Sequence, residues 1–361
     1  MLVYVDDLLM VTDNPKPTFD AIMKRYSLKG DGYAPPERYL GANIEEFEFE
    51  DGYKCWSMSA RDYVLSASEI VKEIAAKHGY KWRKPHRPWA TNWKPELETS
   101  RECNDDEVHS YQQVIGMLRW AVELGRVDIH LELSQLSQYN ACPRIGHLMK
   151  AFEVFNYLHN RPQRKIVFDA RPVNITRNAA EHEWTEFYRD AKEAIPSNRP
   201  EPRGKAVNIT CFVDADHAGN SVTRRSHTGF VIYVNGAPIV WYSKRQNTVE
   251  ASTFGSEFNA MRIALEAIES LRYKLRMFGI PIDGPADMMC DNNAVVQNSQ
   301  APHSTLQKKH NSICYHRVRE AVAAGTILVH KESTLSNVAD LLTKVLSREK
   351  RDQHLHSLVY D

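Results

Sequence analysis

The order of secondary structure after residue 205 constrains the fold of this 361-residue chain more than any other feature. Apolar runs and a long amphipathic helix predict elements in the order β-β-β-α-β-α-α-β-α. The expected strands are 207–214, 227–234, 237–243, 286–290 and 326–331, and the expected helices are 252–278, 292–298, 312–324 and 337–346. The turn Asn235-Gly236 favours a hairpin between the second and third strands. We therefore expect one α/β unit here.

The residues before this unit have a mainly helical pattern. Apolar runs on both sides of Asp6 and Asp7 predict a short hairpin, and alternation around Asp51-Gly52 predicts a second hairpin over 38–59. Helices are expected at 17–26, 61–78, 107–124, 127–139 and 143–159. The stretch 81–106, rich in Pro and Trp, indicates an irregular connector. The Pro-rich stretch 171–206 is the expected linker, with room for a short helix at 180–194.

Composition excludes several classes of protein. Lys and Arg number 46, as do Asp and Glu, so the net charge of zero argues against a uniformly basic surface but leaves room for a local basic face. No apolar run approaches the ~18 residues that a membrane span requires, so no membrane contact is expected. Six cysteines without a CxxC pair indicate neither a disulfide framework nor a clear zinc site. A reducing intracellular compartment is the expected location.

Four acidic residues stand where an apolar core is expected. Glu257 falls inside the apolar stripe of the long helix, where a carboxylate is costly unless it is paired or bound to a metal. Asp214 and Asp291 each end an apolar strand, and Asp340 follows an expected Asn337 cap. Taken singly, each acid has an ordinary explanation: a stripe edge that reaches solvent, a turn residue or a helix cap.

Together, the four acids indicate a metal site. Hard cations such as Mg²⁺ prefer carboxylate oxygens, and two such ions can activate water and stabilise the leaving oxygen of a phosphodiester. Asp216 competes with Asp214, because residues two apart in a strand point to the same side. Asp214 is preferred because it directly follows the apolar run.

At these residues the sequence resembles the ribonuclease H domain of copia-type LTR retrotransposon polyproteins. The matching blocks include VDADHAGN, RRSHTGFVIYVNGAPIVWYSKRQNTVEASTFGSEF, CDNNAVV, KKHNSICYHRVRE and VADLLTK, in order across about 210–346. The resemblance implies a mixed α/β, ribonuclease H-like fold with a central mixed five-stranded sheet. It also implies that Asp214, Glu257, Asp291 and Asp340 are the metal-binding acids.

The N-terminal part resembles the reverse transcriptase of the same polyproteins. YVDDLLM is similar to the polymerase active-site hairpin, and RYLGANIE and YQQVIGMLRWAVELGRVDIHLELSQLSQY are similar to the palm end, thumb and connection. The implied organisation is a partial palm and thumb at 1–80, a helical thumb/connection region at 81–170, a linker at 171–206 and a ribonuclease H-like domain at 207–361. Asp6 and Asp7 then match the two polymerase acids of the hairpin.

The chain departs from this family in two respects. The third polymerase acid and the fingers would lie before Met1, so we expect no polymerisation by this chain alone. The remainder of a Pol polyprotein is an expected partner. The loop 331–337 lacks the histidine that assists product release in many relatives, and neither His310 nor His330 is a clear substitute. His310, Cys314 and His316 could suggest zinc, but a structural or RNA-contacting role is preferred.

The implied substrate is an RNA–DNA hybrid. From residue 205 onward the chain has 18 Lys and Arg against 15 Asp and Glu, so this half is basic outside its acidic centre, as phosphate binding requires. Expected nucleic-acid contacts are Arg224, Arg225, Ser226, Lys244, Gln246, Asn292, Lys308, Lys309 and His310. The hybrid would be recognised through its shape and 2′-hydroxyls.

The implied mechanism is hydrolysis of the RNA strand with two Mg²⁺ ions, or Mn²⁺ in their place. Asp214 is expected to bridge both ions, with Glu257 and Asp291 on one side and Asp340 on the other, leaving 5′-phosphate and 3′-hydroxyl ends. Two alternatives stay open: a catalytically silent transposon relic that only binds nucleic acid, and a polymerase subunit that needs a longer partner chain. The expected locations are the cytoplasm, a virus-like particle or the nucleus.

Overall fold

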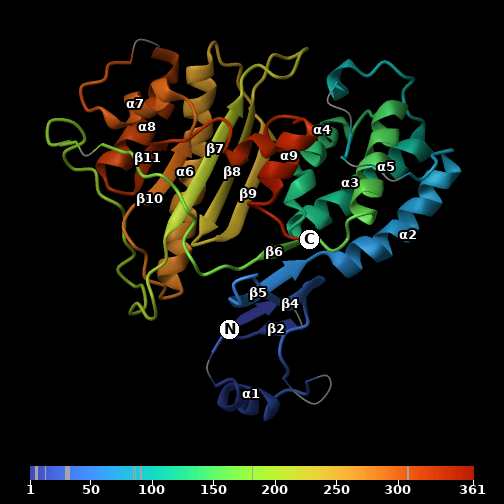
Figure 1. Ribbon diagram of the computed structural model, residues 1–361, viewed down its shortest axis with the longest axis horizontal. Coiled ribbons are helices and arrows are strands. Elements are labelled where there is room, and N and C mark those ends of the chain that lie inside the picture. Colours follow the sequence, from blue (N-terminus) through green and yellow to red (C-terminus); the bar gives the residue numbers. More distant parts are fainter. Residues whose placement is uncertain are drawn as a thin grey trace.

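The computed structural model describes residues 1–4, 7–12, 14–28, 33–83, 85, 87–89, 92–180, 182–306 and 309–361. Figure 1 shows two main bodies side by side: a sheet covered by helices α6, α7 and α8, and a helical body that contains α2 to α5. A small lobe formed by β1, β2 and α1 extends from one end of the molecule (Figure 1).

The sheet of the C-terminal half is built around strand β7 (Ile209–Asp216). Antiparallel β8 (His227–Val234) and β9 (Ala237–Arg245) follow on one side of β7. Parallel β10 (Ala286–Cys290) and β11 (Ile327–Lys331) follow on its other side, which gives the order β11-β10-β7-β8-β9. The expected mixed five-stranded sheet is thus confirmed, and with it the ribonuclease H-like fold class.

Both faces of this sheet are covered. Helix α6 (Thr253–Met277) lies on one face with α7 (Asn293–Gln300) and α8 (Ser312–Ala323), and its apolar stripe, including Phe258, Met261 and Leu265, is fully buried there. The opposite face packs against the 3-10 helix η5 (Val338–Leu342) and the C-terminal helix α9 (Arg348–Leu355). Because both faces are covered, the strands β7, β8 and β10 are buried along almost their whole length rather than at alternate residues.

Two helix predictions are wrong. The helix expected at 337–346 is only the short η5, and α9, which the sequence reading missed, comes after it. No helix forms at 182–194; instead, long-range pairs hold this segment, since Glu193 accepts hydrogen bonds from Arg272 and Arg276 at 2.6–2.7 Å. Tertiary ion pairs have replaced the helical hydrogen bonds that local propensity favoured.

The N-terminal half contains a second sheet of four strands, in the order β3-β4-β5-β6. Strands β4 (Ala42–Glu48) and β5 (Lys54–Ser59) confirm the hairpin expected at 38–59, and β3 (Arg38–Tyr39) lies beside β4. Strand β6 (Lys165–Val167) was not expected, because three residues carry no recognisable period. It extends this sheet from a position more than a hundred residues further along the chain.

The remaining elements of this half are mostly helical, as expected. The helices are α1 (Lys16–Met23), α2 (Arg61–Lys77), α3 (Asp105–Glu123), α4 (His130–Leu136) and α5 (Ile145–His159). Short 3-10 helices are η1 (Pro95–Leu97), η2 (Val127–Ile129), η3 (Ser137–Tyr139) and, in the other half, η4 (Lys309–Asn311). None of the described helices combines the length and apolarity needed to cross a membrane.

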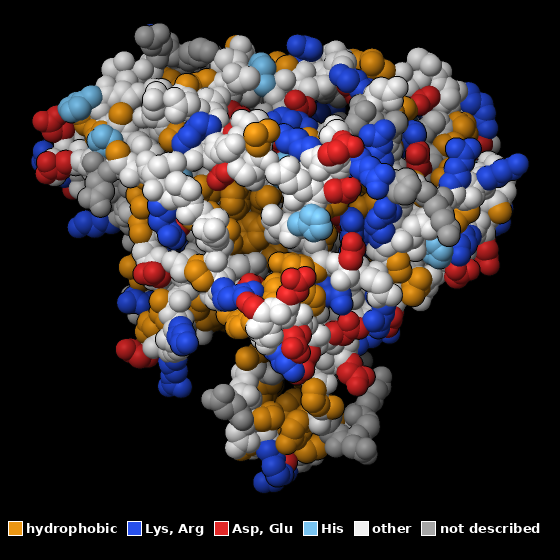
Figure 2. All heavy atoms as spheres, in the orientation of Figure 1, with side chains coloured by type: hydrophobic (Ala, Val, Ile, Leu, Met, Phe, Trp, Pro, Cys, Tyr) orange, Lys and Arg blue, Asp and Glu red, His pale blue; other side chains and the backbone are white. Residues whose placement is uncertain are grey.

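The small N-terminal lobe consists of the hairpin β1 (Leu2–Tyr4) and β2 (Asp7–Leu9) with α1. Figure 2 shows apolar side chains gathered on the visible surface of this lobe. Val3, Val11 and Met23 are among the exposed large apolar residues. A grouped apolar surface of this kind marks either a contact region or a tendency to associate.

Buried ion pairs lie within the N-terminal half and between that half and the C-terminal helix α9. The Arg126 guanidinium donates to Asp128 at 2.9 Å, and both side chains are fully buried. Arg164 also contacts Asp128, and Arg351 of α9 contacts Glu132 of α4, each at 3.1 Å. Removing one partner of a buried ion pair strongly destabilises a protein, so the contact between α9 and α4 depends on both Arg351 and Glu132.

Candidate metal centre

Three of the four predicted acids meet at one edge of the large sheet. Asp214 lies near the end of β7, Asp291 directly follows β10, and Glu257 projects from the first turns of α6. Each offers a carboxylate oxygen, and the three oxygens lie within 4.8 Å of one another. Among the described residues, no other group of three or more His, Cys, Asp or Glu side chains has this spacing. Asp214 rather than Asp216 joins the cluster.

Burial makes this cluster electrostatically costly without a cation. Asp214 and Glu257 are 1% and 5% exposed. Burial, with the nearby Asp340 and Asp291 carboxylates, raises the pKa of Asp214 to about 6, although Lys344 opposes the shift. Burial and repulsion from Asp214 and Asp291 raise the pKa of Glu257 well above its usual range. A bound cation would relieve both effects.

One oxygen in the cluster lacks a protein partner. Glu257 Oε2 is buried and makes no hydrogen bond within the described part of the chain. Buried polar atoms are normally satisfied by hydrogen bonds or ions, so each exception asks for an explanation. A set of three carboxylates with an unsatisfied oxygen is the donor set that a hard divalent cation prefers. The residues present therefore fit Mg²⁺ or Mn²⁺.

The fourth acid, Asp340, lies beside the cluster but is held by lysines. Lys344 Nζ contacts Asp340 Oδ1 at 2.8 Å and Asp214 Oδ1 at 3.1 Å, while Lys350 Nζ contacts Asp340 Oδ2. Burial acts against ionisation of Asp340, but the hydrogen bonds from Lys344 and Lys350 hold its pKa below the usual value. One ammonium group thus occupies the space between two predicted metal ligands.

The absence of a side chain on the strand next to Asp214 allows η5 and the residues after it to approach Asp214 closely. Gly229 of β8 is the register partner of Asp214, and a Cβ atom placed there would lie 2.6 Å from Thr343 Cγ2 and 2.7 Å from Leu342 Cβ. Asn337 Nδ2 donates to the Val213 carbonyl at 3.0 Å and ties the start of η5 to β7. Glycine at 229 is therefore required for Thr343 to reach and donate to Asp214 Oδ2.

The structure separates the predicted nucleic-acid contacts into accessible and buried residues. Arg224, Lys244 and Lys309 are exposed, and Arg225 and Asn292 are half-buried. Ser226 and Gln246 are a correction: both are buried, and both bond to the protein, since Ser226 Oγ accepts from Ala218 N and Gln246 Nε2 donates to Thr228. They support the loops rather than offer a surface contact. Lys308 and the side chain of His310 lie outside the described residues.

The other residues singled out in the sequence lie away from the acids. Asp7 is exposed on β2 in the small lobe of Figure 1, and Asp6 lies outside the described residues. His330 is buried and contacts Asp287 at 2.9 Å, so its role is structural. His316 contacts Tyr188, and Cys314 contacts Asn259, which agrees with the structural reading of that segment rather than with zinc.

Sequence reasoning missed the lysines and the threonine around the acids. Thr343 and Lys344 belong to the block VADLLTK, and Lys344 lies four residues after Asp340, a spacing at which side chains on a helical turn meet. That spacing was a usable signal for the contact with Asp340. The second contact of Lys344, with Asp214, depends on packing between segments 130 residues apart and had no local signal.

The fold and the acidic cluster define a ribonuclease H-like unit with a candidate metal centre. No family model matches the chain. It is 26% identical over 351 residues to the "Retrovirus-related Pol polyprotein from transposon RE2" of Arabidopsis thaliana, covering 96% of this chain and 21% of that protein. It is 24% identical over 359 residues to the Pol polyprotein from transposon TNT 1-94 of Nicotiana tabacum, covering 97% and 23%.

The chain is thus homologous to copia-type retrotransposon Pol polyproteins over most of its length, as its motifs predicted. It spans about a fifth of the length of these plant relatives. Among solved structures, LC11-RNase H1 in complex with an RNA/DNA hybrid is 18% identical, with a TM-score of 0.31, covering 41% of this chain and 99% of that one. The foamy viral protease-reverse transcriptase in complex with an RNA/DNA hybrid is 16% identical, with a TM-score of 0.27, covering 42% and 21%.

Proposed function

We propose that the C-terminal half of this chain is a metal-dependent nuclease that hydrolyses the RNA strand of RNA–DNA hybrids. The observation that carries the proposal is the convergence of Asp214, Glu257 and Asp291 from three elements, with oxygens within 4.8 Å. The homology to Pol polyproteins supports the choice of substrate, because copying RNA into DNA produces such hybrids. By the same homology, residues 1–170 are proposed to derive from a reverse transcriptase.

The acids hold the metal in this proposal. Asp214, Glu257 and Asp291 supply its carboxylate ligands, and the apolar strands behind them exclude bulk water from that side. Bound Mg²⁺ would lower the pKa of a coordinated water and stabilise the leaving oxygen of the phosphodiester. Thr343, by donating to Asp214 Oδ2, fixes the orientation of that carboxylate. The products would carry 5′-phosphate and 3′-hydroxyl ends.

The proposed role of Asp340 depends on Lys344. In a two-metal site, Asp214 and Asp340 would share the second ion, yet the Lys344 ammonium contacts both carboxylates. Lys344 would therefore compete with a second cation for these two carboxylates. In the metal-free protein it neutralises two acids that would otherwise repel each other.

Replacing Lys344 with methionine is expected to strengthen Mn²⁺ binding about tenfold, or to add a second ion per chain, because the place of the ammonium becomes free for a cation. Isothermal titration with MnCl₂ measures this directly. Lys274→Met, at an exposed lysine near the C-terminal end of α6, is the matched control. Unchanged affinity and stoichiometry in Lys344→Met would remove Lys344 from the cation-binding position.

The purified chain is expected to cleave labelled RNA in a hybrid when Mg²⁺ is present, and to leave it intact in EDTA. Asp291→Asn should abolish this cleavage, because it removes one of the three converging carboxylates. Asp352→Asn, at an exposed ion pair on α9, is the control for a change of one surface charge. Full activity of Asp291→Asn would reject the site, and absence of cleavage by the unaltered chain, with Mn²⁺ still bound in titration, would favour a silent relic.

A further inference from the structure

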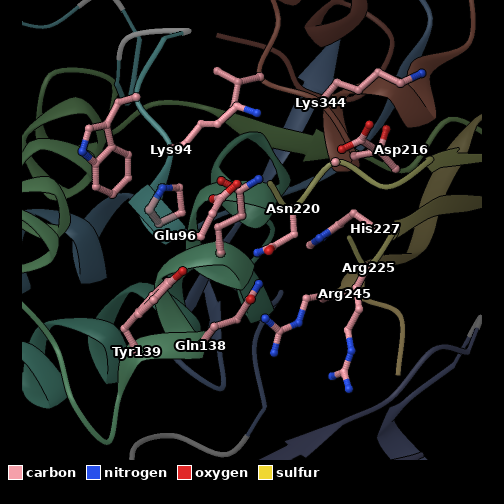
Figure 3. A pocket seen from close by; sticks show the side chains of 16 residues that line it. Lys94, Glu96, Gln138, Tyr139, Asp216, Asn220, Arg225, His227, Arg245 and Lys344 are labelled. Atoms are coloured by element: carbon pink, nitrogen blue, oxygen red, sulfur yellow. The ribbon is translucent and has the colours of Figure 1, made fainter. Parts of the chain in front are cut away.

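A cavity of about 260 Å³ lies between the two halves of the chain, beside the metal centre. Figure 3 shows that Gln138 and Tyr139 reach it from the helical body, whereas Arg225 and Arg245 reach it from the side of the large sheet. The connector at 93–96 and the loop at 219–220 complete its wall. The cavity therefore exists only because the two halves are packed together.

Two arginines of this cavity have no ion-pair partner among the described residues. Arg225 and Arg245 are half-buried, and neither makes an ion pair with any described residue. Glu96, in contrast, accepts a hydrogen bond from the Ser221 backbone amide at 2.8 Å, and Lys94 Nζ donates to Ser221 Oγ at 2.7 Å. These two contacts hold the connector at 93–96 against the loop that contains Ser221. They do not involve the guanidinium groups of Arg225 and Arg245, which can therefore contact a ligand.

The other titratable groups on the wall do not cancel this positive charge. His227 is buried and bonds to Ser243 at 2.9 Å, and burial lowers its pKa to about 3, so it is neutral near pH 7. Lys94, Arg225 and Arg245 face Glu96 and Asp216, whereas Lys344 is paired with Asp214 and Asp340, so the wall retains an excess of positive charge that favours an anionic ligand.

The cavity also adjoins the acidic cluster. Thr343 and Lys344 line it, and the same two side chains contact Asp214. A strand whose scissile phosphate lies at Asp214 would place a neighbouring part of its backbone close to this opening. Guanidinium groups suit such a ligand, because their planar donors match phosphate oxygens.

We propose that this cavity binds a backbone phosphate of the nucleic-acid substrate, with Arg225 and Arg245 as its ligands and with its wall completed by the N-terminal half. The proposal rests on the proposed nuclease function. It gives the connector around Lys94 and the helix end at Gln138 and Tyr139 a role in substrate binding. The N-terminal half is then a part of the nuclease's substrate site and not only a neighbour of it.

Arg245→Gln and Arg225→Gln in the full chain should each weaken binding of a fluorescein-labelled RNA–DNA hybrid about three- to tenfold, because each removes a phosphate contact. The slope of log affinity against log salt concentration should fall by about 1 in each variant. Fluorescence anisotropy in EDTA measures both quantities without metal-dependent cleavage. Arg199→Gln, an exposed arginine outside the cavity, is the matched control and should change neither.

Unchanged affinity and salt slope in both variants would overturn the cavity as a phosphate site, even if the chain cleaves hybrids. Weakened binding in these variants by a chain that cleaves nothing would uphold the cavity and reject the nuclease. Competition with inorganic phosphate separates the two sources of the same ligand chemistry: phosphate that binds the unaltered chain but not Arg245→Gln, and that does not displace the hybrid, would assign the cavity to free phosphate instead. Thermal melting of each variant shows whether the fold is retained.

Discussion

Replacing Glu257 with glutamine is expected to reduce hybrid cleavage at least about a hundredfold and to raise the melting temperature of the metal-free protein. The two effects have one origin. Glu257 is buried against Asp214 and Asp291, and burial together with these neighbours raises its pKa. Glutamine retains the shape but removes the buried charge, which relieves the repulsion and also removes a metal ligand.

The increase in stability is the part of this prediction that identifies a functional residue. A glutamate kept for structural reasons would have partners, and its replacement would destabilise the protein; Glu257 Oε2 has no partner among the residues described. A relief of about 1 kcal/mol corresponds to a rise of a few degrees in a domain of this size. Residues that weaken the fold but are required for activity are typical of active sites.

Glu266→Gln is the matched control for this experiment. It lies on the same helix, α6, and makes an exposed ion pair with Arg262. Its replacement should change neither cleavage nor melting temperature appreciably, since exposed pairs contribute little. If Glu257→Gln melts at a lower temperature than the unaltered chain, or still cleaves at the control's rate, Glu257 is a structural residue and the cluster has been misassigned.

The acids of the candidate site could be predicted from sequence because each carried a local signal. Glu257 interrupts an apolar helical stripe, and Asp214 and Asp291 end apolar strands. The ends of neighbouring strands in such sheets meet at one edge, so acids predicted at strand ends are expected to lie close together in the fold. The resemblance to ribonuclease H domains implied a central mixed five-stranded sheet, and the sheet β11-β10-β7-β8-β9 confirms it.

What could not be predicted depends on contacts between distant segments. Strand β6 pairs with β5 across more than a hundred residues. Helix α9 has little apolar pattern of its own, and the buried Arg351 holds it against Glu132 instead. The cavity joins residues near positions 94, 139, 225, 245 and 344. No window of sequence contains such a set, so only the packed structure shows that these side chains share one space.

Arg351→Ala is expected to lower the free energy of unfolding by about 3–5 kcal/mol, the usual cost of removing one partner from a buried ion pair. Arg351 is buried, and it contacts Glu132 Oε1 at 3.1 Å and the Asp128 carbonyl. Without it, the Glu132 carboxylate, 2% exposed, would be left without its cation. Urea denaturation followed by circular dichroism measures the change, and Arg348→Ala on the same helix, with its 59% exposed side chain, is the control.

A double replacement separates loss of a charge pair from loss of packing. In Arg351→Met with Glu132→Leu, both buried charges disappear together, so most of the lost stability should return. Equal stabilities of Arg351→Ala and Arg348→Ala would show instead that the contact between α9 and α4 contributes little. The result also concerns the site, because α9 carries Lys350, which contacts Asp340. If the buried pair fixes α9, then the N-terminal half, through Glu132 on α4, holds one of the lysines that set the charge of the nuclease acids.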